Sequence, residues 1–204
     1  MKTEGVVKYY EGVAVEAGQE VSAEAARKLA NYAKAFFRTS GQLDRVEVHT
    51  DGQLTRVDYP AERGGGDDIQ AAHARMYSGT GFSIRRKLSS PQGFSWEEVE
   101  SHAASGGREG STLVLQRKGG QGLMEVELDR NRKVQRVTKY CWEGEDELRY
   151  VFEYNAGGRL VSVYDLTHGD QVRIEDLRST LPEPGFFERG LTLPSALSHT
   201  AIPL

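Results

Sequence analysis

Residues 41–46 read Gly-Gln-Leu-Asp-Arg-Val, and residues 52–57, eleven positions further on, read Gly-Gln-Leu-Thr-Arg-Val. Each copy begins with a glycine, the residue that best tolerates the positive φ of a tight turn. Asp51 precedes the second glycine, and an Asp-Gly pair between two alternating runs is a strong hairpin signal. Apolar and charged residues alternate after each turn, with Val46 and Val48 on one face. The repeat therefore predicts consecutive antiparallel strands joined by tight turns.

Two diverged copies of this turn lie in the second half of the chain. Residues 155–163 keep the turn glycine, the leucine and the valine. Residues 129–137 keep the same frame but have Arg132 at the glycine position, where we expect Asn131 to supply the left-handed residue instead. Four turns of one kind predict one long meander or two related sheets.

One stretch resembles a known repeat family. Residues 152–163 contain an aromatic residue, one further residue, a Tyr-Asn pair, two residues and Gly-Arg-Leu, which resembles the tyrosine-aspartate (RHS/YD) repeat with Asn155 in the place of aspartate. The copies at 41–57 lack the Tyr-Asp pair and are similar to the short β-hairpin repeats of small bacterial antitoxin-like proteins. The resemblance covers roughly a third of the chain. It implies a scaffold without catalytic residues, with too few copies to enclose a toxic domain as long arrays of such repeats do.

Length, cysteine content and hydropathy limit the class of protein. A chain of 204 residues fits one domain or two small ones and can bury a core without cross-links. Cys141 is its only cysteine, so an internal disulfide framework is excluded. The first residues lack the apolar run of a secretion signal, and no run of about 18 apolar residues occurs. We expect a cytoplasmic protein that does not enter a membrane.

Charge argues against nucleic acid as a partner. The formal net charge is -4 and the pI is about 5.8, whereas nucleic-acid binders usually carry a basic excess. A local basic patch remains open as an alternative around one turn, formed by Arg130, Arg132, Lys133, Arg136 and Lys139. Acidic residues at 125, 127 and 129 precede the turn, so we interpret the cluster as a solvated strand face with cross-strand charge pairs.

Helices are predicted before each group of strands. Ser22 is a candidate N-cap for a helix with an apolar stripe from Ala25 to Phe36. Asp68 is expected to cap a short helix that runs to Met76 or Tyr77. Ser95 and Glu98 match a capping box, which predicts another short helix that stops near residue 106.

The remaining segments alternate as strands. One strand is expected from Val6 to Val15, and others at 112–117, 123–129, 134–142, 147–154, 160–165 and, less regularly, 171–177. The predicted fold class is therefore α+β: an antiparallel β meander, built as two related helix-then-meander halves, with two or three short helices packed on it. We divide it into an N-terminal half (1–63), a glycine-rich link with short helices (64–110), a C-terminal meander (111–177) and a proline-containing apolar tail (178–204), all within one compact unit.

The tail combines prolines with large apolar residues. Prolines at 182, 184, 194 and 203 oppose regular structure, yet Phe186, Phe187 and Leu197 are too apolar for a solvated segment. We expect the tail to cover a sheet of its own chain. The alternative is that it docks onto a partner or onto a second copy as a homodimer.

Few residues are candidates for chemistry. Cys141 shares a strand face with Val137, which predicts a buried, inert thiol rather than a nucleophile. The five histidines show no metal-ligand spacing, and we predict no metal, no cofactor and no catalytic residue. Asp165, His168 and Asp170 form the densest polar group; they either satisfy a turn or place a general base in a small-molecule site.

The function favoured by these patterns is protein binding without catalysis. The predicted binding residues are those of an acidic hairpin, namely Trp142, Glu143, Glu145, Asp146 and Glu147. Together with the repeat resemblance, they indicate an immunity- or antitoxin-like protein of a bacterial toxin system, whose partner is a protein such as a toxin. A small-molecule enzyme or ligand-binding protein with a site near Asp165, and a structural subunit of a larger assembly, are the alternatives.

Overall fold

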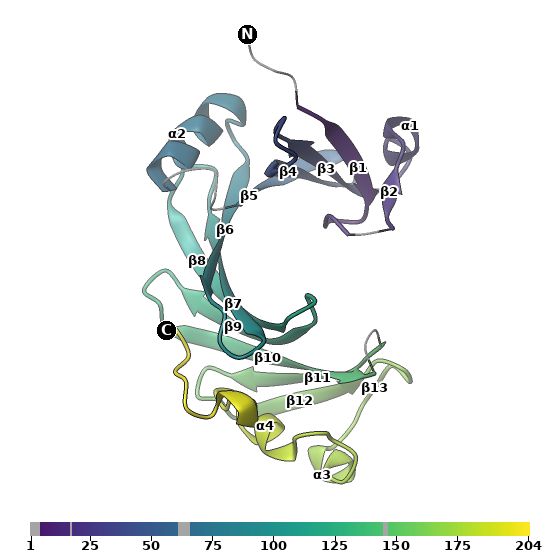
Figure 1. Ribbon diagram of the computed structural model, residues 1–204, viewed down its shortest axis with the longest axis vertical. Helices are drawn as coiled ribbons and strands as arrows, with labels where there is room; N and C mark the ends of the chain where they lie inside the picture. Colours follow the sequence, from purple (N-terminus) through teal and green to yellow (C-terminus); the bar gives the residue numbers. More distant parts are fainter. Residues whose placement is uncertain (1–4, 17, 61–65, 145–146) are drawn as a thin grey trace. The chain divides into compact units, whose positions relative to one another are not determined.

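The computed structural model describes residues 5–16, 18–60, 66–144 and 147–204 (Figure 1). Within them, thirteen strands pair in the order β13-β12-β11-β10-β9-β8-β7-β6-β5-β4-β3-β1-β2. The strands are β1 (Val7–Glu11), β2 (Glu20–Val21), β3 (Asn31–Phe37), β4 (Leu43–Thr50), β5 (Gln53–Pro60), β6 (Gly81–Ser89), β7 (Phe94–His102), β8 (Arg108–Arg117), β9 (Gly122–Asp129), β10 (Val134–Glu143), β11 (Glu147–Asn155), β12 (Leu160–Asp165) and β13 (Asp170–Gln171). The helices are short: α1 (Ala23–Ala26), α2 (Gly66–Met76), α3 (Ile174–Leu177), α4 (Pro184–Glu188) and the 3₁₀ turn η2 (Ser195–Leu197).

The chain divides into two compact units. Unit 1 comprises the described residues up to Arg86 together with Glu100–Glu109, and unit 2 comprises Lys87–Val99 and Gly110–Leu204. In unit 1, β1, β3 and β4 enclose one apolar cluster around Ala33 and Ala35, while α2 packs on β5 and β6 through a second cluster around Ile69. Unit 2 has one larger core.

The predicted α+β fold class is wrong. Most of the structure consists of strands in one sheet, and the helices are few and short. The sheet is mixed, because β5 and β6 pair in parallel while the other pairs with assigned register are antiparallel. Two parallel strands cannot be joined by a tight turn and need a crossover, and α2 lies in that connection. The two halves are therefore not copies of one helix-then-meander plan. The consecutive antiparallel order from β8 to β13 is the part of the chain that does form a meander.

The turns of the internal repeat are formed as predicted. Asp51 and Gly52 both have positive φ, 50° and 72°, which is the conformation of a tight two-residue hairpin turn. In the diverged copy the prediction for Asn131 is wrong, because Arg132 itself has a φ of 63°. The Asp129 carboxylate accepts the backbone N–H groups of residues 131 and 133, which holds the turn without a glycine.

The first predicted helix ends after a single turn. Ser22 is the predicted N-cap, and its Oγ accepts the Ala25 N–H at 3.1 Å, but the helix stops at Ala26. The stripe that continued to Phe36 belongs instead to β3, where Ala33 and Ala35 are buried and alternate with larger, half-exposed side chains. The backbone of β3 is hydrogen-bonded to β1 on one side and to β4 on the other. Its side chains therefore alternate between two faces with a period of two residues, and the helical spacing seen in the sequence is not used.

The capping-box prediction is also wrong. Ser95 and Glu98 lie in the strand β7, along which Trp96, Glu98 and Glu100 are buried in alternation. The strands predicted between residues 112 and 165 are present, and β12 has the predicted bounds of 160–165. The strand predicted from Val6 to Val15 is shorter than expected, since β1 ends at Glu11. The predicted strand 171–177 is wrong, since β13 ends at Gln171 and α3 follows. The helix expected to run to Met76 is present as α2, but it begins at Gly66, so Asp68 lies inside the helix and is not its cap.

The C-terminal segment (residues 178–204) lies against the sheet of its own unit. Phe186, Phe187 and Leu197 are buried in the core of unit 2, and Figure 1 shows α4 beside one side of β11 and β12. Lys139 holds this segment, since its fully buried ammonium donates to the backbone carbonyls of Phe186, Arg189 and Thr192 at 2.5, 2.7 and 2.7 Å. The Tyr154 hydroxyl adds a bond to the Phe187 carbonyl at 2.6 Å.

Candidate protein-binding surface

The sheet of unit 2 has two faces that differ in burial. Side chains alternate along β8 to β12, so every second residue shares a face with its partners on neighbouring strands. The covered face carries the core of unit 2, into which the C-terminal segment packs. The opposite face is here called the open face: its residues are all at least partly exposed and none belongs to that core. The open face comprises Thr112, Val114, Glu125, Glu127, Arg136, Thr138, Tyr140, Val151, Glu153, Ser162 and Tyr164.

Strand register arranges the open face in rows. One row runs directly across five strands and consists of Val114, Glu125, Thr138, Glu153 and Ser162. The row contains two carboxylates, and its other three side chains are small. Small side chains leave a flat surface on which a partner can lie close to the sheet.

A second row contains aromatic side chains. Tyr140, Val151 and Tyr164 are register partners, and Tyr164 accepts a hydrogen bond from Gln171 Nε2 at 3.0 Å. Burial raises the pKa of Tyr140, and the nearby Glu125 carboxylate raises it further, so this phenol stays neutral at physiological pH. Half-exposed tyrosines are amphipathic anchors that are common in protein interfaces.

The charges of the open face are predominantly negative. Arg136 pairs with Glu127 at 2.6 Å and approaches Glu153 at 3.7 Å, while Glu153 also accepts from the Ser162 hydroxyl at 2.8 Å. Glu125 is the third carboxylate of the open face, and it lies near Tyr140. The open face is complementary to a basic surface.

Residues of the predicted basic cluster separate in space. Arg136 lies on the open face, whereas Lys139 points to the covered face and is buried. Arg132 pairs with the buried Glu98 at 2.6 Å and donates to the Pro203 carbonyl at 3.1 Å. The cross-strand pairing of Arg136 with Glu127 was predictable from the sequence, but these other positions were not.

The predicted acidic hairpin lies at one end of the same sheet. Trp142 is half-buried, and its indole N–H donates to the Gly122 carbonyl at 2.6 Å. Glu143 and Glu147 are exposed and face each other across β10 and β11, and Glu143 pairs with Arg149. Glu145 and Asp146 lie outside the described residues. The sequence-based prediction of binding residues was confined to this hairpin and did not include Glu153 or Tyr164, whose alternation with buried neighbours was the available signal for a second face.

The polar group at the end of β12 is organised as a turn. The Asp165 carboxylate accepts the Thr167 N–H at 2.9 Å and contacts His168 Nδ1 at 3.0 Å, and the hydrogen bond from His168 lowers the pKa of Asp165. The His168 side chain is 65% exposed, and Asp170 is exposed as well. These contacts describe a capped turn whose imidazole points into solvent.

The described part of the chain contains no group of three or more His, Cys, Asp or Glu side chains placed to hold a metal ion. Cys141 is buried in the core of unit 2, and burial raises the pKa of its thiol. None of the helices in the described ranges is long and apolar enough to cross a membrane.

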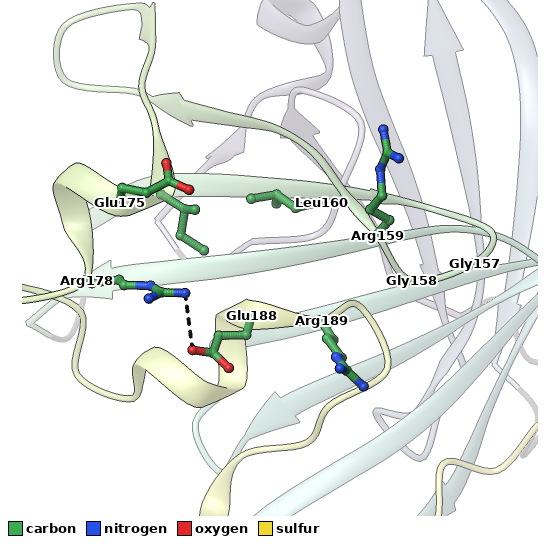
Figure 2. Close-up of a pocket in the computed structure, with 9 residues that line it drawn as sticks. Gly157, Gly158, Arg159, Leu160, Glu175, Arg178, Glu188 and Arg189 are labelled. Carbon is green, nitrogen blue, oxygen red and sulfur yellow. Dashed lines mark ion pairs between the residues drawn. The ribbon is translucent and has the colours of Figure 1, made fainter.

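A groove of about 540 Å³ borders the turn between β11 and β12. Figure 2 shows that the side chains of Arg178 and Glu188 meet across it, at 3.5 Å, whereas those of Arg159 and Arg189 extend in different directions. The charged groups therefore do not converge on one point. This groove lacks the geometry of an anion site, and the open face is the stronger candidate.

No protein-family model, curated protein or solved structure matches this chain.

Proposed function

We propose that this protein is a non-enzymatic protein-binding module that covers a basic surface of its partner with the open face. The observation that carries the proposal is the contrast within one sheet. One face is filled by the protein's own C-terminal segment, while the other presents Glu125, Glu127 and Glu153 beside two tyrosines. Interfaces of this kind combine aromatic anchors with charges complementary to the partner.

Within this function, the class we favour is that of immunity or antitoxin proteins, which neutralise a toxin by covering it. Two features support this class. The tyrosine-aspartate-like segment at 152–163 forms part of β11, its turn and β12, and both strands contribute to the open face. The chain is also acidic, with a formal charge of -4, as suits a partner with a basic site.

The test compares two charge-reversed variants of the tagged full-length chain. The open-face variant carries Glu125→Lys, Glu127→Lys and Glu153→Lys, and the control carries Glu24→Lys, Glu109→Lys and Glu175→Lys at exposed positions elsewhere. Both change the net charge equally. We expect the wild type and the control to retain the same near-stoichiometric protein from the native host, and the open-face variant to lose it by a factor of roughly ten or more.

Thermal unfolding of both variants establishes that they fold. Equal retention by the folded open-face variant and the control would refute the open face as the binding surface. A wild-type chain that retains no protein at all would refute the function itself.

A further inference from the structure

Two turns of unit 2 border an open hollow of about 480 Å³. One turn joins β6 to β7 and contains Gly93, and the other joins β8 to β9 and contains Gly119 and Gly120. The Lys118 N–H donates to the Gly93 carbonyl at 2.7 Å, so the two turns lie side by side. The hollow is therefore bordered by backbone that is hydrogen-bonded across the two turns, and its volume lies in the usual range of small-molecule sites.

Positive charge predominates around this hollow. Its charged lining residues are three cations, Lys87, Arg117 and Lys118, and one carboxylate, Glu97. Within the described ranges none of the three cations forms an ion pair, and Arg117 donates to the amide oxygen of Gln121 at 3.4 Å. Glu97 has an interaction of its own. The described part of the chain thus leaves the positive charge of the hollow to be neutralised by a ligand.

Neutral hydrogen-bonding groups complete the polar lining. Ser95 on β7 and Gln116 on β8 alternate with the core residues Trp96 and Leu115, so they share one side of the sheet. Ser90 adds a hydroxyl from the turn between β6 and β7. Cations, hydroxyls and amides are the groups that bind phosphate oxygens in proteins. A phosphate monoester carries a charge of about -1.5 to -2 at pH 7, which suits three cations better than a monovalent anion does.

We propose that this hollow is a binding site for a small phosphate monoester, whose phosphate oxygens are held by Lys87, Arg117 and Lys118. The space is larger than a phosphate group, so it also has room for the organic part of the ligand. Gln116 follows Val114 along the same side of β8, so the hollow borders the open face, but none of its lining residues is an open-face residue.

The test is a titration of the full-length chain with phenyl phosphate at low ionic strength, followed by phosphorus NMR of the ligand. We expect saturable binding to one site. Lys87→Gln with Lys118→Gln should weaken it roughly tenfold or more, because two charge-assisted hydrogen bonds are lost. The control carries Lys28→Gln with Lys133→Gln at exposed positions elsewhere and should bind as the wild type does. Both variants lose two positive charges, so an effect of net charge alone would weaken them equally.

A second ligand tests the preference for phosphate. Benzenesulfonate has a similar size and a single negative charge, and we expect it to bind several-fold more weakly than phenyl phosphate. Unsaturable binding, equal weakening in the two folded variants, or equal affinity for the two ligands would overturn the proposal.

The charge-reversed open-face variant separates this site from the proposed function. It should bind phenyl phosphate at least as tightly as the wild type, because its substitutions lie outside the hollow and add positive charge. A wild-type chain that retains its protein partner but binds no phenyl phosphate would refute the phosphate site alone. A chain that binds phenyl phosphate through Lys87 and Lys118 but retains no protein would support the phosphate site and refute the proposed function.

Discussion

The covered and open faces of unit 2 are built by the same strands, yet they differ in what their side chains contact. On the covered face Phe152 meets Phe187 of the C-terminal segment at a ring distance of 4.5 Å, and both rings are buried. On the open face the next residue, Glu153, accepts a hydrogen bond from the Ser162 hydroxyl and lies 3.7 Å from the Arg136 guanidinium. Adjacent residues of one strand therefore serve different purposes, since the two-residue period places a core ring on one face and a charged side chain at the surface on the other.

The largest effect is expected on the covered face. Phe187→Ala should lower the free energy of unfolding by about 3–5 kcal/mol, because it removes a buried ring and leaves a cavity. Val151→Ala on the open face is the matched control, with an expected loss of about 1 kcal/mol. Urea unfolding of both variants measures the two values. Equal losses would show that the open face is also packed in solution, and the two faces would then not differ in their contribution to stability.

Much of the covered face could not be read from the sequence. The turns and the strands after residue 110 follow from local signals, namely Asp-Gly and glycine turns and two-residue alternation. The partners of Lys139 lie 47 to 53 residues further along the chain, and no local pattern links them. In the sequence of an alternating strand, nothing distinguishes a lysine on the buried face from a lysine on the solvent-exposed face.

The helix errors have a physical cause as well. A capping box at Ser95 and Glu98 predicts a helix only when the segment has no strand partners, and β7 pairs with β6 and β8. The open face was partly predictable, since Glu125 and Glu127 were recognised as cross-strand partners of basic residues. Its extension to Glu153 and Tyr164 required the register of β10, β11 and β12.

The second prediction concerns pH and the covered face. Burial lowers the pKa of Lys139 from its usual value of 10.5 to about 7. Between these values the unfolded chain binds more protons than the folded one, so the stability contribution of this group rises with pH from about 7 to about 10.5. The three carbonyl acceptors favour the ammonium, which keeps the rise below the limit of about 1.4 kcal/mol per pH unit.

Lys139→Met isolates this contribution, because methionine fills similar space without titrating. We expect the variant to be less stable overall, with three carbonyls left unsatisfied, and its stability to rise less than that of the wild type between pH 7 and pH 10. Unfolding by urea at several pH values measures both slopes. Parallel pH profiles for the two proteins would show that the lysine keeps its charge throughout this range.

The smallest effect is expected at the centre of the open face. Arg136 is half-exposed and pairs with Glu127, and such surface pairs contribute about 0.2–1 kcal/mol. Arg136→Ala should therefore change the free energy of unfolding by less than about 1 kcal/mol, and the change should shrink further in high salt, which screens the pair. The same substitution removes the cation that pairs with Glu127 and lies near Glu153, so those carboxylates lose their partner. Association with an oligolysine peptide, followed at low ionic strength, should become faster than for the wild type, because electrostatic steering acts on the approach of the partner. A loss of stability well above 1 kcal/mol would place Arg136 among the residues that hold the fold, whereas a small loss together with faster association is the behaviour of a surface shaped for a basic partner.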